Sequence, residues 1–274
     1  MALAFPFNHH PCWSSERSIV WERIHLPVAR NCNVQCGFCS NNIGSCDTLG
    51  PGGCEKIMDP EKAISTLAIE SKKRPNLRIV GISGPGDPLF NNATFTTLQK
   101  VRDDFNGFHI CLCTNGLLLE DKSPNLAELG VNTISVSMSA LNPNIVSSIY
   151  SWAMINGHVE SGKKMAETVV SLQLRGIKAA SDLGILVKVN TILIPSINSN
   201  DIGELANAIQ EAGASMQNIV PLIPRGRISD EIPPSHEQIM TARKRAGEYL
   251  PQFSHCKQCR SDVVGVPGCD SVLS

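Results

Sequence analysis

Cysteine is the residue type in this sequence with the clearest capacity for chemistry. Eleven cysteines occur among 274 residues, although a chain of this length can form a core without disulfide staples. Metal or redox chemistry therefore explains them better. They fall into an N-terminal, a central and a C-terminal group: Cys12, Cys32, Cys36, Cys39, Cys46 and Cys54, then Cys111 and Cys113, then Cys256, Cys259 and Cys269.

Cys32, Cys36 and Cys39, hereafter the loop cysteines, have the most informative spacing, Cys-x-x-x-Cys-x-x-Cys. Three thiolates on one short loop can bind three irons of a cubane iron–sulfur cluster and leave the fourth iron open. A zinc site is the alternative, but zinc sites usually combine two separated Cys-x-x-Cys units into a tetrahedral set. We therefore expect these three residues to bind a catalytic 4Fe–4S cluster.

Polar residues in two predicted turns could hold a small ligand beside that cluster. Gly84, Gly86 and Asp87 belong to a Gly-Pro-Gly-Asp-Pro turn, and Thr114 and Asn115 follow another strand. Backbone amides and a few polar side chains are what a zwitterionic ligand needs. A plain turn between a strand and a helix is the alternative for the glycine-rich segment.

Ser137, Lys188 and Asn190 are polar residues in otherwise apolar strands. A polar side chain inside a barrel needs a partner. That partner is either a bound ligand or an internal hydrogen-bond network, and the sequence leaves both open.

The elements that position these residues alternate between strands and helices. Asp59 and Pro60 predict a helix start, with aspartate as the N-cap and proline in the first helical position. Near-continuous apolar strands suit a parallel sheet that helices cover. The predicted strands span residues 24–29, 77–83, 109–113, 133–138, 186–194 and 218–223.

Six such strand–helix units most naturally form an α/β fold, a partial (β/α)6 TIM-like barrel. The loops at the carboxyl ends of barrel strands carry the chemistry, and the cysteine loop and both polar turns follow strands. We expect a core barrel over residues 24–225, an N-terminal extension over 1–23, and a C-terminal helix with a Cys-x-x-Cys tail over 226–274. Both extensions should lie over the barrel mouth.

Charge and hydropathy restrict the partners and the compartment. The formal net charge is -1, so no overall positive field attracts nucleic acid. No apolar run approaches the roughly 20 residues of a membrane helix, and the start lacks a signal-peptide pattern. We expect a soluble, cytoplasmic protein whose partners include neither nucleic acid nor a membrane.

Several short motifs, spread over nearly the whole chain, resemble those of one protein family. They lie at residues 10–12, 24–29, 32–36, 80–89, 111–117, 149–152, 218–223 and 255–262. Together they resemble the NifB family of the radical S-adenosylmethionine (SAM) superfamily, in its short form without the C-terminal NifX-like domain. The combination of Cys12 with Cys256 and Cys259, hereafter the outer cysteines, is the most particular feature.

The resemblance implies a radical SAM enzyme of cofactor maturation. In the superfamily the open iron of the cluster binds SAM, and an electron from the cluster cleaves SAM to a 5′-deoxyadenosyl radical. The polar residues at 84, 86, 87, 114, 115, 137, 188 and 190 would then bind SAM.

NifB-family enzymes also hold two further 4Fe–4S clusters as substrates. They fuse these clusters around a carbide from SAM into an 8Fe-9S-C product, NifB-co, the nitrogenase cofactor precursor. The resemblance assigns one cluster to the outer cysteines and the other to His25, Cys46 and Cys111. From the residues alone, His25 is more often a packed histidine with a carbonyl partner, and the tail motif could be a zinc knuckle completed by His255.

The same resemblance implies three protein partners: an iron–sulfur cluster donor, a reductant such as ferredoxin or flavodoxin, and a cofactor acceptor or carrier. One segment departs from the family. After Cys46 the family has Asn-Glu-Ser-Arg-Pro-Gly, whereas residues 47–53 here contain neither glutamate nor arginine. A paralogue that matures another metalloenzyme, a radical SAM enzyme that modifies a peptide, and a non-catalytic iron–sulfur scaffold or carrier are the alternatives.

Overall fold

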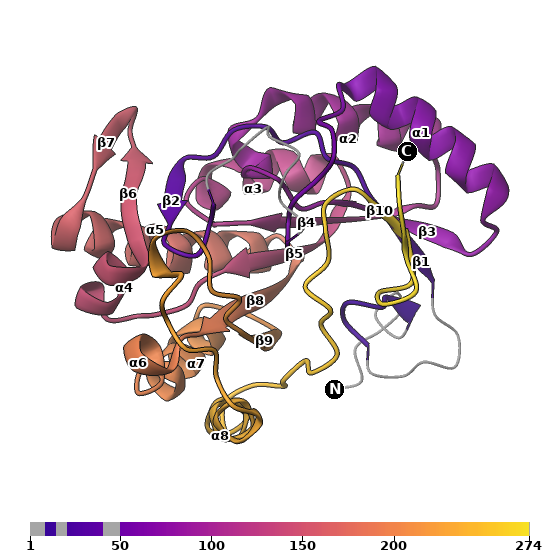
Figure 1. Ribbon diagram of the computed structural model, residues 1–274. Helices are drawn as coiled ribbons and strands as arrows, with labels where there is room; N and C mark the ends of the chain where they lie inside the picture. The colour runs from indigo at the N-terminus through magenta and orange to yellow at the C-terminus, as the bar shows by residue number, and fades with distance from the viewer. Residues whose placement is uncertain (1–8, 15–20, 41–49, 274) are drawn as a thin grey trace.

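The computed structural model describes residues 9–14, 21–40 and 50–273 of the chain. In these residues the main sheet contains six parallel strands whose spatial order follows the chain (Figure 1). The first and last of them do not pair, so the sheet is an open barrel and the predicted fold class is confirmed. The strands are β1 Glu22–His25, β3 Leu77–Ile82, β4 His109–Thr114, β5 Val131–Ser137, β8 Leu186–Leu193 and β9 Met216–Pro221.

Strand β1 differs most from its prediction, because it ends at His25 and not at residue 29. The amide of Leu26 still donates to the carbonyl of Gly81 over 2.9 Å. Pro27 has no N–H group and cannot continue the ladder. The chain therefore leaves the sheet early, which begins the long loop that carries the loop cysteines.

Helices follow the strands and cover the outer face of the sheet. Helix α1 starts as predicted, with Pro60 in its first turn and the Asp59 side chain accepting a bond from the Lys62 amide. None of the described helices is long and apolar enough to span a membrane. The helices are α1 Pro60–Lys73, α2 Asn92–Asp104, α3 Leu119–Glu128, α4 Pro143–Ile149, α5 Gly162–Asp182, α6 Pro195–Asn198, α7 Ile202–Glu211 and α8 His236–Ala246, with 3-10 turns η2 Pro88–Phe90 and η3 Gly226–Ile228.

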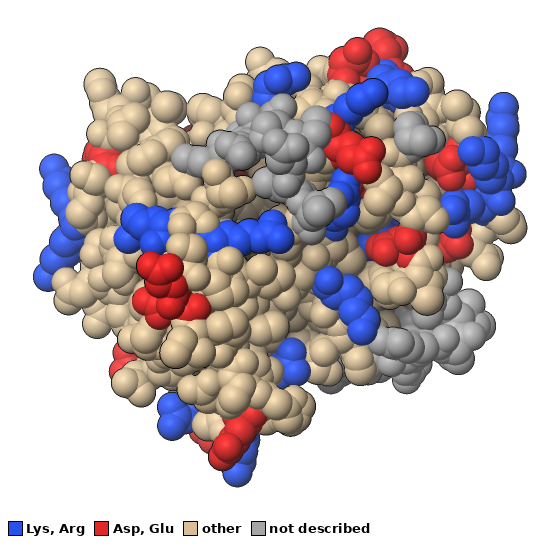
Figure 2. All heavy atoms as spheres, viewed as in Figure 1, with Lys and Arg blue, Asp and Glu red and all other residues tan. Residues whose placement is uncertain are grey.

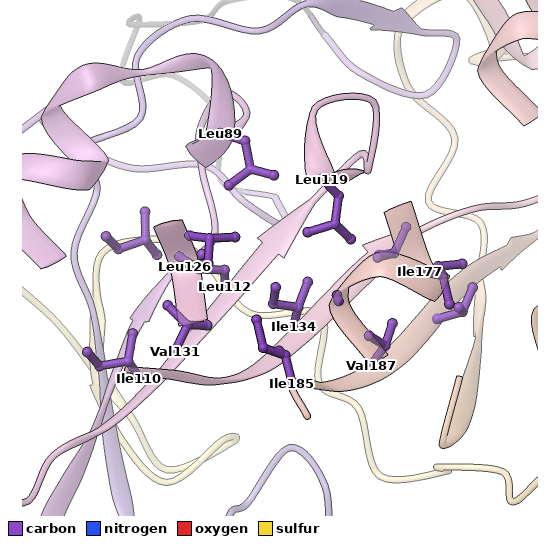
Figure 3. Close-up of a cluster of buried hydrophobic side chains, with 14 of the residues drawn as sticks. Leu89, Ile110, Leu112, Leu119, Leu126, Val131, Ile134, Ile177, Ile185 and Val187 are labelled. Carbon is purple, nitrogen blue, oxygen red and sulfur yellow. The ribbon is translucent and has the colours of Figure 1, made fainter. Parts of the chain in front are cut away.

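The main core lies between the sheet and these helices (Figure 3). Ile110, Ile134 and Val187 from three neighbouring strands pack there against Leu126 and Ile177 from α3 and α5. Burying each such side chain contributes about 1.5–3 kcal/mol. Because side chains alternate along a strand, this packing leaves the intervening residues to face the barrel interior.

A second, smaller sheet that the sequence did not predict supports the cysteine loop. It consists of β2 Val34–Cys36, β6 Tyr150–Ile155 and β7 His158–Glu160. Cys36 pairs with Tyr150 in this sheet, and the Met154 amide donates to the Asn33 carbonyl over 2.7 Å. The segment that contains the first two loop cysteines is therefore fixed by backbone pairing.

The C-terminal tail connects the two edges of the open barrel (Figure 1). Phe253 and Gln217 of β9 are joined by a backbone hydrogen bond of 2.7 Å. Further on, β10 Val263–Gly265 pairs antiparallel with β1, and β11 Ser271–Val272 pairs with β10. The residues between these two attachments, including Cys256 and Cys259, therefore cross the open side of the barrel.

Charged side chains of both signs are interspersed over the described part of the face in Figure 2. Exposed ion pairs such as Lys178 with Asp182 and Arg175 with Glu120 likewise combine the two signs. A short row of Lys and Arg side chains crosses the left and centre of this view, and the formal net charge of the whole chain is -1.

Candidate active site

A cavity of about 400 Å³ inside the barrel collects most of the residues that the sequence singled out. Gly84 does not line it, although its neighbours Ser83 and Pro85 do, and Cys46 lies outside the described residues. The predicted residues that line the cavity are Cys12, His25, Cys32, Cys36, Cys39, Gly86, Asp87, Cys111, Thr114, Asn115, Ser137, Lys188, Asn190, Cys256 and Cys259.

The three loop cysteines share one wall of this cavity. The amide of Cys39 donates to the Cys36 carbonyl over 3.1 Å, and the Gly37 amide donates to the Ile149 carbonyl over 2.7 Å. Asn115 approaches the same loop, since its side-chain amide donates to Asn33 Oδ1 over 2.6 Å and contacts Cys32 Sγ at 3.9 Å. Three thiols on one fixed loop are a donor set that fits a cubane cluster.

The glycine-rich turn supports this loop from below. A Cβ atom at Gly86 would lie 2.1 Å from the Asn31 carbonyl oxygen, so a larger residue cannot occupy this position without movement of the backbone. The Gly86 amide donates to Ala29 O over 2.6 Å, and the Asp87 amide donates to Asn31 O over 2.9 Å. The turn therefore contacts the cysteine loop directly and fixes the position of that loop relative to the sheet.

Asp87 uses its carboxylate to join two loops of the protein. Its Oδ1 atom accepts from the Leu89 amide over 2.9 Å, and its Oδ2 atom accepts from Thr114 Oγ1 over 2.8 Å and the Asn115 amide over 2.6 Å. Burial raises the pKa of Asp87, while these hydrogen bonds act in the opposite direction. Asp87 therefore positions Thr114 and Asn115 at the cavity.

His25 and Cys111 lie on the two strands that flank Gly81. They can approach each other because glycine has no side chain to fill the space between them. His25 pairs with Gly81, and Gly81 pairs with Cys111, across three neighbouring strands. His25 Nε2 and Cys111 Sγ are 3.2 Å and 3.1 Å from the point that a Cβ atom at Gly81 would occupy. The Nδ1–H group of His25 donates to the Arg260 carbonyl over 2.9 Å, which leaves Nε2 as the free acceptor that can bind a metal.

Burial favours the protonated form of several thiols that line the cavity. It raises the pKa of Cys32 to about 11 and that of Cys111 to about 12, and it raises the pKa of Cys12, Cys36 and Cys259 as well. A thiol must lose its proton to bind iron, so metal binding here releases protons.

The outer cysteines come from both ends of the chain and meet at the same cavity. The backbone carbonyl of Cys259 accepts from the Gly52 amide over 3.0 Å. Within the described ranges, no three His, Cys, Asp or Glu side chains converge closely enough for a single metal ion. The ligands of a cubane need not converge on one point, because each thiolate binds a different iron.

The polar strand residues form internal contacts on the cavity wall. The Asn218 side-chain amide donates to Asn190 Oδ1 over 2.9 Å, and Asn190 Nδ2 lies 3.7 Å from Cys113 Sγ. Ser137 also interacts with the Cys113 thiol. Lys188 donates to the Cys12 carbonyl over 2.6 Å. These side chains therefore have partners within the protein and also line the cavity, and their role in binding a ligand stays a prediction.

Sequence reasoning missed Arg23, Tyr150 and Arg225. Arg23 is fully buried, donates to the Gly265 carbonyl, and contacts both Asp270 and the Cys259 thiol. Tyr150 and Arg225 line the cavity. No clear signal in the sequence marked Arg23, because this residue precedes the predicted strand over residues 24–29.

Comparisons with known proteins identify the family to which this sequence is similar. Residues 26–209 match the Radical SAM superfamily. The FeMo cofactor biosynthesis protein NifB of Methanocaldococcus jannaschii is 39% identical over 94% of this chain and 86% of its own length. The NifB of Klebsiella pneumoniae is 37% identical over 95% of this chain, which spans only 57% of that relative.

Solved structures share the fold. Streptococcus suis SuiB, for which a complex with S-adenosylmethionine is also known, has a TM-score of 0.62 at 13% identity and covers 85% of this chain and 49% of its own. A radical SAM methyltransferase from Sphaerobacter thermophilus has a TM-score of 0.56 at 19% identity, with 85% and 65% covered. The family match and the NifB relatives together show that this chain is a radical SAM enzyme and belongs to the NifB family.

Proposed function

We propose that this protein fuses two 4Fe–4S substrate clusters and inserts a carbide from SAM, to give the 8Fe-9S-C precursor of the nitrogenase cofactor. The observation that supports the proposal is one cavity lined by thiols from the cysteine loop, from β4 and from both ends of the chain. A radical SAM enzyme that modifies a peptide needs the loop cysteines, but it does not need the outer cysteines. The names of the NifB relatives support the same function.

The loop cysteines would hold the resident 4Fe–4S cluster of the radical SAM family. With SAM bound, that cluster supplies the electron that cleaves SAM. The protein's own part is to hold the three thiols on a loop that β2 and the glycine-rich turn fix in place. Thr114 and Asn115, positioned by Asp87, and Ser137 and Asn190 offer polar groups to SAM on the cavity wall.

The substrate clusters would occupy the rest of the cavity. We assign one to the outer cysteines and the other to His25, Cys111 and Cys46, of which Cys46 lies outside the described residues. The free Nε2 atom of His25 and the neighbouring Cys111 thiol suit this role because both face the gap at Gly81. Imidazole binds iron more weakly than thiolate, which suits a substrate that must leave.

A cluster donor, a small reductant protein and a cofactor acceptor would be the partners. They follow from the proposed reaction, because its substrates are preformed clusters, its radical chemistry consumes electrons, and its product must be passed on to the enzyme that uses it. Ferredoxin or flavodoxin is the reductant that we propose.

Anaerobic reconstitution tests the proposed function. The wild-type protein should bind iron for up to three 4Fe–4S clusters and cleave SAM to 5′-deoxyadenosine. Cys36→Ala should abolish cleavage, because two thiolates cannot hold the cluster in its chelating geometry. Replacing all three outer cysteines by alanine should remove one cluster's worth of iron and stop fusion, while SAM still binds.

Cys269→Ala is the matched control, since this cysteine is exposed and does not line the cavity. Wild-type protein that binds iron for a single cluster only, in careful anaerobic preparations, would instead favour the peptide-modifying enzyme. Cleavage of SAM at the wild-type rate by Cys36→Ala would refute the assignment of the loop cysteines.

A further inference from the structure

Lys188 is a buried cation in the cavity wall. It lies on β8, is 3% exposed, and lines the cavity next to Cys12. Its Nζ atom donates to the Cys12 carbonyl over 2.6 Å. Among the described residues no carboxylate forms an ion pair with it. A buried ammonium group without an anionic partner is costly, so its surroundings must compensate for the charge.

Two aromatic rings from opposite ends of the chain supply part of that compensation. Lys188 Nζ lies 5.0 Å from the centroid of Trp13 and 5.0 Å from the centroid of Phe253. Each contact of this kind is worth about 0.5–2 kcal/mol, with the upper values at desolvated sites. Trp13, Phe253 and Met216 also form a small apolar cluster with Cys12 at its edge. Lys188 thus touches the N-terminal segment and the C-terminal segment at once.

Both of those segments carry outer cysteines. Trp13 directly follows Cys12, and Phe253 lies three residues before Cys256. Lys188 also acts electrostatically on the Cys12 thiol. A cluster bound by three thiolates carries a net negative charge, and a fixed cation beside one ligand offsets that charge without moving.

We propose that Lys188 is a positioning residue for the outer substrate cluster: it holds the Cys12 segment against the Phe253 segment and supplies the positive charge that the bound cluster requires. This inference rests on the proposed function. Direct binding of the SAM carboxylate by Lys188 is the competing role. One carbonyl and two rings already surround its ammonium group, which leaves little of it for a third ligand.

The test compares Lys188→Met and Lys188→Arg with wild-type protein after anaerobic reconstitution. Methionine is close to lysine in volume and removes an unpaired buried charge, so Lys188→Met should fold. It should lose one cluster's worth of iron and the Mössbauer component that Cys12→Ala also loses, and it should bind SAM with an affinity within about twofold of wild type. Lys188→Arg should restore most of the iron, because it keeps the charge and can stack on both rings.

Three further variants sharpen the result. Lys178→Met is the matched control, because Lys178 is an exposed lysine on α5, and it should keep all of the iron. Trp13→Leu should reproduce the iron loss of Lys188→Met through a different contact. Combining Lys188→Met with Cys12→Ala should cost no more iron than Cys12→Ala alone, because both changes act on one site.

Full iron and an unchanged Mössbauer spectrum in Lys188→Met would overturn the inference while leaving the proposed function intact. Loss of SAM binding with full iron would overturn it in favour of the SAM-carboxylate role. A wild-type protein that binds only one cluster would remove both the proposed function and this inference.

Discussion

The space above Gly81 decides how closely His25 and Cys111 approach each other. Both side chains lie within 3.2 Å of the position that a Cβ atom would take. A glycine in the middle of a strand normally weakens it, and it often marks a place where other atoms must come close. At this position the close approach brings together an imidazole and a thiol.

Replacing Gly81 with alanine should therefore disturb the site formed by His25 and Cys111. The new methyl group would lie 2.7 Å from His25 Cδ2, which forces one neighbour to move at a cost of about 1–3 kcal/mol. We expect urea denaturation to show this loss of stability, and reconstituted protein to contain less iron. Glycine to alanine at Gly203, which has open space around it, is the control. Normal stability and iron in Gly81→Ala would contradict this account.

His109 makes folding depend on pH. Burial lowers its pKa from 6.5 to about 4, and its ring lies edge-on to that of His10, with centroids 5.3 Å apart. Between pH 6.5 and 4 the unfolded chain binds a proton at this residue and the folded chain does not, so stability decreases as the pH falls through this range. The resulting decrease in the free energy of unfolding across this range is about 3 kcal/mol.

His109→Gln should reduce the pH dependence of unfolding. Denaturation of the apoprotein at a series of pH values gives the slope, which should fall by up to one proton between pH 6.5 and 4. If the free energy of unfolding depended on pH equally in the two proteins, His109 would titrate normally in the folded state, which would contradict this account.

At the scale of elements, the glycine-rich turn and the end of β4 act as one unit through Asp87. Its two carboxylate oxygens accept bonds from Leu89, Thr114 and Asn115. The turn in addition bonds to the cysteine loop through Asn31. Three segments that are separate in sequence therefore keep a fixed relation at the cavity.

Asp87→Asn should loosen this unit although it changes few atoms. In either orientation the new NH₂ group faces a backbone N–H donor, of Leu89 or of Asn115, and an unpaired buried donor costs about 1–3 kcal/mol. We expect a lower midpoint of urea denaturation and a several-fold weaker affinity for SAM by equilibrium dialysis. Exposed Asp104→Asn serves for comparison. Unaltered SAM affinity in Asp87→Asn would separate this residue from the ligand site.

Five of the six parallel strands could be predicted because each is long enough to show an apolar run, whereas β1 has the sequence Glu-Arg-Ile-His and only half of it lies in the predicted strand. Strand β2 could not be predicted, since Val34–Cys36 has only three residues and depends on a partner distant in sequence. Strands β6 and β7 were not predicted, although the Asn156-Gly157 pair between them is a hairpin signal. The loop cysteines were recognisable from type and spacing. Lys188 shows the limit of such reasoning: its polarity within an apolar strand marked it, but its partners, Trp13 and Phe253, depend on tertiary contacts.

At the scale of the whole molecule, the C-terminal tail completes the barrel. It is attached to β9 near Gln217 and to β1 through β10, and it crosses the gap between them. Arg23 fixes the second attachment, since its buried guanidinium donates to Gly265 and pairs with Asp270. The attachment of the tail to β1 therefore depends on the buried charge of Arg23.

Asp270→Asn should release the tail from β1. The variant leaves the Arg23 charge without its carboxylate. Breaking a buried pair from one side typically costs about 3–5 kcal/mol, and the cost is lower here because Asp270 is partly exposed. Hydrogen exchange should rise in residues 256–273 and remain unchanged in β4 and β5. Asp182→Asn, in an exposed pair with Lys178, should leave exchange as in wild type. Protection of the tail in Asp270→Asn would show that β10 holds it without the ion pair.

The attachment of Asp270 to Arg23 also sets an order in time during synthesis. The two residues are 247 positions apart, and a ribosome translating roughly 5–20 residues per second needs about 12–50 s to cover that distance. For most of this interval, once β1 has emerged from the ribosome, it lacks the segment that later pairs with its edge, and Cys12 lacks Cys256 and Cys259. We therefore expect the part of the cavity formed by the cysteine loop and β4 to fold first on the nascent chain, and the part that contains the outer cysteines to form only when translation is almost complete.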